Sequence, residues 1–285
     1  MTDSTDSLVI ATSAEDTVRI YTASTIGVVE EARRIHQTWP TATAAFGRVL
    51  TGTLMMGVMS DTLKRLTIQF AGEGPLGKIL AVSNQPGTVK GFLENSQVDL
   101  DLNKFGKFDI AKAVGPGTLT VIKDHGLKNP YNGVVPIQSG EIGADLAYYF
   151  NKSEQIPSAV GLGVLVAPDG HVQAAGGFIV QLLPGCSEPT TGALEEIASQ
   201  IPAVTTLLNS GETPLQLAER FAIGGLKILA ELPVKYQCDC SKERFRGPLL
   251  SLGQRELDQI IQEQGQIEVQ CQFCNRKYSF QAEEL

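Results

Sequence analysis

The sequence has no long uninterrupted apolar run and no N-terminal stretch of the secretory type. Its most apolar segment, residues 42–59, is interrupted by Arg48 and several glycines, and it is at the short end for a bilayer span. We therefore expect a buried helix there. Residues 1–10 contain neither the basic region nor the apolar core of a signal peptide. These features predict a cytoplasmic protein without a membrane partner.

The chain also lacks an excess of positive charge. It contains 23 Lys and Arg against 31 Asp and Glu, which gives a formal net charge of -8. The tail from Val234 onward is close to balanced, with seven basic and eight acidic residues. Affinity for nucleic acid depends on clustered Lys and Arg, so we expect no nucleic-acid partner.

Histidine is scarce, and no catalytic motif contains it. His36, His125 and His171 lie far apart in the sequence, and none has the surroundings of a zinc protease or nucleophile-elbow motif. Asp99 and Asp101 would share one face of a strand, where a solvated face is the expected reading. The sequence therefore predicts a protein that is not an enzyme.

One glycine-rich stretch resembles a nucleotide-binding motif by its letters alone. Residues 72–77 fit the pattern G-x-G-x-x-G and follow a predicted strand. A dinucleotide site requires this motif to open a helix, whereas Pro75 and the strand-like residues that follow indicate a hairpin turn. We expect a turn and no bound nucleotide.

Cysteine is the informative residue type. Four of the five cysteines lie near the C-terminus, as Cys238, Cys240, Cys271 and Cys274. Thiols at i and i+2 of an extended segment point to the same side, and a Cys-x-x-Cys turn can present two more. Four thiolates around one centre form the closed tetrahedral set that structural zinc prefers. We predict one Zn²⁺ per chain, bound by these four residues in their reduced form.

Apolar periodicity predicts an α+β protein with largely antiparallel sheets and helices. An α+β core domain is expected over 1–183, a helical connector over 184–233 and a small C-terminal zinc-binding domain over 234–285. Short helices are expected over 192–230, one capped by Thr213 with Pro214 in its first turn. Expected strands include residues 17–24, 66–70, 78–83, 88–93, 118–123, 158–166 and 171–182.

Two apolar features of this pattern allow a second interpretation. The connector helices present an apolar face that we expect to pack on the core, and this face would become a binding surface if its cover could be removed. Glycine and alanine alternate with apolar residues over 160–166 and 174–180. This alternation indicates close sheet packing, although it would also suit an adhesive surface.

Zinc would decide whether the last domain folds, because a module of its size is near the limit for a hydrophobic core alone. The metal would close a loop of about 30 residues between the two cysteine pairs. Disulfides between neighbouring cysteines would close only small rings and would not replace that closure. Crossed disulfides would preserve it, and the sequence leaves the choice open.

Several stretches carry a family resemblance that spans nearly the whole chain. The paired Cys-x-Cys and Cys-x-x-Cys follow a body that contains GPGTLTVIKD at 115–124, PYNGVVP at 130–136 and SGEIGADLAYYF at 139–150. In this combination the chain resembles the heat-shock protein 33 family of redox-regulated molecular chaperones. Cys186 has no place in the cysteine motif, and we assign it no inherited role.

This resemblance implies an ATP-independent holdase that binds unfolding client proteins under oxidative stress. It implies a reduced form kept inactive by zinc on four cysteines, and activation by the disulfides Cys238–Cys240 and Cys271–Cys274 with release of the metal. It further implies that the active oxidised form is a homodimer.

Two other functions compete with this reading. A constitutive structural zinc ribbon could act as a nucleic-acid or protein binding module, although the balanced charge of the tail counts against nucleic acid. A thiol-disulfide oxidoreductase would place its Cys-x-x-Cys at the start of a helix, whereas residues 277–280 after Cys274 read as a strand.

Overall fold

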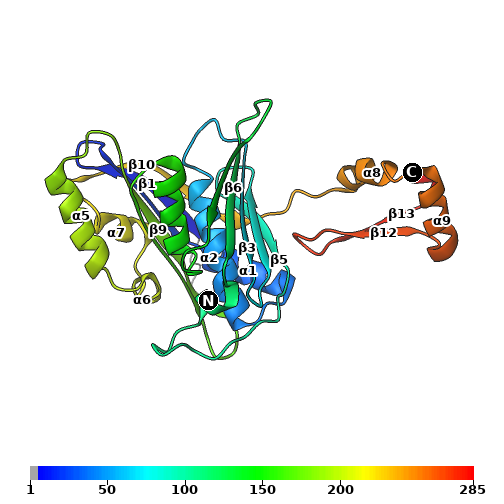
Figure 1. Cartoon of the computed structure of the whole chain (residues 1–285), viewed down its shortest axis with the longest axis horizontal. Helices are drawn as coiled ribbons and strands as arrows, with labels where there is room; N and C mark the ends of the chain where they lie inside the picture. The colour runs from blue at the N-terminus through cyan, green and yellow to red at the C-terminus, as the bar shows by residue number, and fades with distance from the viewer. Residues whose placement is uncertain (1–5) are drawn as a thin grey trace. The chain divides into compact units, whose positions relative to one another are not determined.

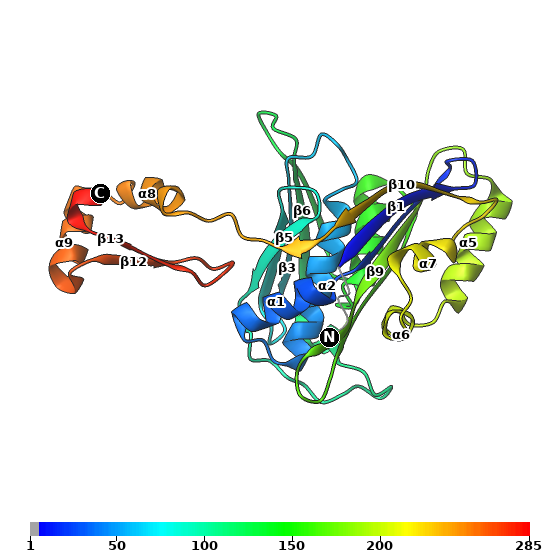
Figure 2. The ribbon, with the colours of Figure 1, turned by 180° about the vertical axis from the view of Figure 1, so that it is seen from behind.

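The computed structural model describes residues 6–285, shown from two sides in Figures 1 and 2. The chain divides into two compact units. The first ends at Tyr236, and the second comprises Gln237–Leu285. The larger unit is built on two sheets, and the smaller one on a single hairpin with two helices.

The first sheet has five strands in the order β10-β1-β2-β9-β8, and every neighbouring pair is antiparallel. Its long central partners β2 and β9 are buried along most of their length. The strands are β1 Ser7–Ser13, β2 Val18–Ser24, β8 Ser158–Val166, β9 Val172–Leu182 and β10 Leu226–Pro233.

The second sheet has six strands in the order β11-β5-β4-β3-β6-β7. All pairs are antiparallel except β11 with β5, which run parallel over two residues. The strands are β3 Arg65–Gly72, β4 Lys78–Ser83, β5 Thr88–Leu93, β6 Gly117–Asp124, β7 Tyr131–Pro136 and β11 Lys235–Tyr236. The predicted α+β class with largely antiparallel sheets is confirmed.

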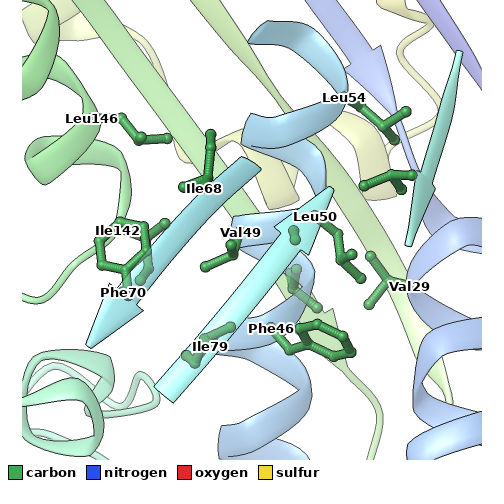
Figure 3. Close-up of a cluster of buried hydrophobic side chains, with 14 of the residues drawn as sticks. Val29, Phe46, Val49, Leu50, Leu54, Ile68, Phe70, Ile79, Ile142 and Leu146 are labelled. Atoms are coloured by element: carbon green, nitrogen blue, oxygen red, sulfur yellow. The ribbon is translucent and has the colours of Figure 1, made fainter. Parts of the chain in front are cut away.

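Helix α2, Pro40–Met56, lies in the core between the two sheets, and it is buried on nearly every side. Figure 3 shows side chains of β3 and β4 directed at it. Small residues allow this close approach: a Cβ at Gly47 would lie 2.7 Å from Val29 Cγ1 and 2.8 Å from Val164 Cγ2. A helix that is apolar all round belongs in an interior, so the predicted buried helix is confirmed.

Shorter helices complete the body. Helix α1, Ile26–His36, packs on α2, and α3, Ile110–Val114, and α4, Gly143–Tyr149, contact it too. A π-helical turn over Phe150–Glu154 continues α4. Throughout the part of the chain that the structure describes, we find no helix with the length and apolarity needed to cross a membrane.

Three helices cover the other face of the five-stranded sheet, as both views show. They are α5 Glu188–Gln200, α6 Val204–Asn209 and α7 Pro214–Glu219. Thr213 caps α7 as predicted, because its side chain accepts a hydrogen bond from the Gln216 amide. The predicted helices over 192–230 are wrong at their end, since Leu226–Pro233 forms β10 and pairs with β1.

The glycine-rich stretch at 72–77 forms the turn between β3 and β4, which confirms the predicted hairpin. Its backbone lies against the end of α3: the Gly74 amide donates to the Val114 carbonyl at 2.9 Å. A Cβ at Gly72 would lie 2.0 Å from the same carbonyl oxygen. These glycines therefore serve close backbone packing.

The smaller unit contains α8 Lys242–Leu250, α9 Gln254–Gln264 and a hairpin of β12 Ile267–Gln270 with β13 Lys277–Phe280. A 3₁₀ turn over Ala282–Glu284 follows. Its fully buried apolar core consists of Leu257, Ile267 and Phe280, with a few partly buried neighbours. A core of this size contributes little stability, so this unit depends on further cross-links.

Candidate metal centre

The first pair of thiols lies on the irregular segment that leads into α8. Cys238 and Cys240 precede Ser241, whose side chain caps the helix by accepting from the Arg244 amide at 3.4 Å. Arg244 Nη1 also donates to the Asp239 carbonyl at 2.9 Å, which closes the segment over the helix start. Residues 237–240 belong to no strand, so an irregular segment presents these two thiols.

The second pair occupies the turn of the β12–β13 hairpin. The Cys271 amide donates to the Arg276 carbonyl at 2.9 Å, and the Asn275 amide donates to the Cys271 carbonyl at 2.8 Å. Asn275 has φ +57°, a left-handed conformation that asparagine tolerates better than most residues. This tight turn directs both thiols to one side, and Lys277–Phe280 continues as the predicted strand.

All four sulfur atoms lie within 4.8 Å of one another, and together they could hold a metal ion. Cys238 Sγ is 3.7 Å from Cys271 Sγ, and Cys240 Sγ is 3.3 Å from Cys274 Sγ. A tetrahedral ion with metal–sulfur bonds of about 2.3 Å places its ligands about 3.8 Å apart. The cluster therefore fits one tetrahedral ion, held by two ligands from each arm.

The thiols differ in their electrostatic surroundings. Burial raises the pKa of Cys238, and it raises the pKa of Cys274 to about 11. Burial also opposes ionisation of Cys240, but hydrogen bonds from Tyr278, Cys274 and Cys238 outweigh it and lower the pKa of Cys240 to about 7. One thiolate thus shares the protons of its neighbours, and a bound cation would replace those protons.

Tyr278 is a functional candidate that sequence reasoning missed. Its hydroxyl donates to the Cys240 carbonyl oxygen at 3.0 Å and lies 3.2 Å from Cys240 Sγ. Its ring packs on Phe245 of α8 with centroids 5.2 Å apart. The contact depends on how the hairpin folds onto the first arm, and the only signal in the sequence was its place four residues after Cys274.

The three histidines considered as catalytic residues lie in different places, and each contacts a different residue. His36 Nε2 lies 3.2 Å from the Tyr236 hydroxyl, His125 contacts Thr62, and His171 contacts Asp169. The three histidines therefore form no shared site in the described part of the chain.

The two carboxylates and the fifth cysteine have structural surroundings. Asp99 Oδ1 accepts from the Thr41 hydroxyl at 2.9 Å beside the start of α2. The strand expected to carry Asp99 and Asp101 is wrong, because both precede the isolated bridge between Leu102 and Phe108. Cys186 is half-buried, with Sγ 3.8 Å from the Thr191 hydroxyl, and it is remote in sequence from the four clustered thiols.

Comparison with known proteins identifies the family of the chain. The family described as Hsp33 protein matches residues 6–281. The chain belongs to the Hsp33 family. The 33 kDa chaperonin of Geobacillus sp. (strain WCH70) is 49% identical to it over 282 residues, which cover 98% of this chain and 96% of that protein. The 33 kDa chaperonin of Bacillus subtilis (strain 168) is 46% identical over 281 residues, with coverage of 98% and 97%.

A solved Hsp33 structure shows the same fold. The crystal structure of the 33 kDa chaperonin (heat shock protein 33 homolog) from Thermotoga maritima superposes with a TM-score of 0.90 at 38% identity. The match covers 98% of this chain and 96% of that one. The predicted resemblance to this chaperone family is therefore confirmed for the chain from β1 through the cysteine cluster.

Proposed function

We propose that this Hsp33 protein is an ATP-independent holdase that oxidation switches on. The observation that carries the proposal is the cysteine cluster: four thiols on two separate arms meet at one centre, in a unit whose own apolar core is very small. A chaperone of this kind needs exposed apolar surface and no catalytic group.

Cys238, Cys240, Cys271 and Cys274 would hold one Zn²⁺ in the reduced chain. The ion, when bound, supplies a cross-link and keeps the four sulfurs deprotonated. The chain's own contribution is to present two ligands from the segment before α8 and two from the hairpin turn. This closed set leaves no open position for a catalytic water, so the site is structural.

Oxidants would attack the thiolates and release the metal. We propose that the products are the neighbouring disulfides Cys238–Cys240 and Cys271–Cys274, which do not join the two arms. The short sulfur distances of the folded unit, 3.7 and 3.3 Å, instead run between arms. All four sulfurs lie within 4.8 Å of one another, so neighbouring pairs are also within reach in the folded unit. Such pairs, formed with loss of the metal, would leave no link between the arms, and separation of the arms would then unfold the unit.

Unfolding would then reach the connector helices. Their buried residues Leu194, Leu207 and Leu208 face the five-stranded sheet beside Phe178 and Val180. Detaching the helices would expose both apolar faces to unfolded client proteins in the cytoplasm, and two active chains would associate as a homodimer. Mass action between exposed apolar surfaces would drive client capture.

The test is parallel measurement of zinc, disulfides and client aggregation before and after peroxide at mildly denaturing temperature. We expect release of about one zinc per chain, two neighbouring disulfides and suppression of aggregation, all reversed by a thiol reductant. Activity with zinc still bound would indicate a constitutive zinc module instead. Crossed disulfides would remove the physical basis of the switch.

A further inference from the structure

The five-stranded sheet ends in β8, whose outer edge has no partner strand, although the start of α4 lies against part of it: a Cβ at Gly143 would be 3.4 Å from the Val160 carbonyl oxygen. Among the described strands, β8 pairs with β9 alone, so the main-chain groups along its other edge are not part of any ladder. Its nine residues, SAVGLGVLV, include no charged residue and no proline. Proteins usually protect exposed edges with charges, proline or short length, because an open edge invites another chain to pair.

The other strands at the sheet ends differ from β8 in composition or length. At the opposite end of the same sheet, β10 contains Lys227, Glu231 and Pro233. In the six-stranded sheet, β11 has only two residues, and β7 is six residues long and ends at Pro136. β8 is thus the end strand that combines nine residues with no charge and no proline, whereas β7 and β10 expose large apolar side chains such as Val134 and Ile228.

A cleft of about 520 Å³ runs along this edge. Residues 160–166 of β8 line it, opposite Phe108 of the loop that follows β5 and residues 201–205, which join α5 to α6 and form the start of α6. A volume of this size falls within the range of ligand-binding clefts in proteins. The open edge thus borders enough space for a segment of another chain.

The charges that line the cleft are all positive. Arg48 and Lys107 are its charged residues, and no carboxylate lines it, although the chain carries a net charge of -8. Glu141 pairs with Arg48 Nη1 at 2.8 Å from outside the lining. A positively charged lining suits an apolar segment that is neutral or acidic. It disfavours a second copy of this chain, because the same cations of the second copy would repel those of the first.

We propose that the β8 edge is a docking site for extended apolar segments of unfolded proteins, which pair with its main chain as an added strand. Main-chain pairing supplies affinity without regard to sequence, as a holdase requires. The apolar side chains of β8 and Phe108 would contact alternate residues of the segment. This inference rests on the proposed function and names the surface that it uses.

The connector forms one wall of the cleft, which links docking to the switch. A Cβ at Gly163 of β8 would lie 2.7 Å from Thr205 Cγ2, so the connector closely overlies the strand there. Helix α5 contributes one buried residue, Leu194, and the partly buried Ile197 to the cluster beneath it. Release of the connector would widen the cleft along β8, so the oxidised protein should bind extended segments more tightly than the reduced protein.

The experiment uses a fluorescent nine-residue peptide of alternating valine and threonine with a glutamate at each end. Two further versions carry N-methyl groups on the valine amides or on the threonine amides. We expect the parent to bind the oxidised full-length chain at least tenfold more tightly than the reduced one, and at least one N-methylated version to lose tenfold or more. Hydrogen exchange of the amides of residues 158–166 should slow when the parent peptide binds.

Charge reversal in one loop supplies the matched variants. Lys107→Glu should weaken binding of the acidic peptide severalfold and strengthen that of a lysine-ended version, whereas Lys104→Glu, in the same loop but outside the cleft, should change neither.

Equal binding of all N-methylated versions, or no slowing of hydrogen exchange at the β8 amides, would overturn the inference. If the oxidised chain then still suppresses aggregation, the proposed function stands without this site; if it binds no client at all, the proposed function fails.

Discussion

At the scale of single residues, the four cysteines are not equivalent. Tyr278 contacts only Cys240 among them, and its single hydroxyl proton faces two acceptors, the carbonyl oxygen and the sulfur of that residue. Because a zinc-bound thiolate is a charged acceptor, it competes for this proton with the neutral carbonyl. We therefore expect Tyr278 to act on the proposed metal site through Cys240, as a hydrogen-bonding partner that orients the sulfur.

Tyr278→Phe removes this hydroxyl and keeps the ring that packs on Phe245. We expect zinc to bind about 10 to 100 times more weakly, the usual cost of losing an outer-shell partner. Competition with a chromophoric chelator measures the affinity. Ser279→Ala, which removes an exposed hydroxyl from the same strand, is the control and should leave it unchanged. Equal zinc affinity in both variants would show that the Tyr278 hydroxyl contributes only to folding.

One of the stretches that carry the family resemblance contains a buried carboxylate. In the stretch SGEIGADLAYYF, Asp145 is 1% exposed. Its carboxylate accepts from the Gln138 and Ser139 amides, each at 2.8 Å, and from the Ile142 amide at 3.3 Å. A buried carboxylate is tolerated when several donors satisfy it, so this motif is structural and needs no catalytic interpretation.

At the scale of elements, the end of the connector is held by two small strands. β10 pairs with β1 in one sheet, and β11 pairs with β5 in the other. Tyr236 secures β11: its hydroxyl donates to the Gly91 carbonyl at 2.8 Å, accepts from the Gly91 amide at 3.2 Å and lies 3.2 Å from His36 Nε2. Unfolding that begins beyond Gln237 must break these contacts before it reaches β10.

Tyr236→Phe should weaken this attachment by about 1 to 3 kcal/mol, because it leaves partly buried polar groups of Gly91 unpaired. Local opening of β11 and β10 should become roughly five to a hundred times more frequent. Hydrogen exchange of the amides of residues 226–236 measures it in the reduced chain. Lys235→Gln, an exposed neighbour, is the control. If the exchange rates of these amides did not change, the attachment of the connector's end would depend on β10 alone.

Elements that depend on local pattern were predictable, and those that depend on distant pairing were not. The fully apolar face of α2, the Thr213 cap and the turn at 72–77 follow from neighbouring residues. The sequence wrongly predicts helix over the first part of β10, because its lysine and glutamate suit a helix as well as an exposed strand. Only pairing with β1, more than 200 residues away in the chain, decides between them. The spacing of Cys238 and Cys240 predicts that their thiols converge, but the irregular segment that presents them depends on contacts with α8.

At the scale of the whole molecule, the two units differ in how they are stabilised. The body buries a large core around α2 and a second cluster under the connector helices, whereas the smaller unit buries three apolar side chains completely. Its ion pairs, such as Lys277 with Glu268 at 2.9 Å, are exposed and contribute little. With a metal on the four cysteines, as proposed, most of the folding free energy of Gln237–Leu285 would come from the metal.

Removing zinc from the reduced chain should thus unfold one unit and leave the other intact. Structural zinc in small domains contributes about 10 to 16 kcal/mol, far more than this apolar core supplies. With chelator and reductant present, we expect amides of residues 257–280 to lose protection from hydrogen exchange while those of α2 keep it. Adding zinc should restore this protection, because the thiols remain reduced and can bind the metal again. If residues 257–280 stayed protected without metal, the cluster would be a passive site, and its oxidation could not act as the switch.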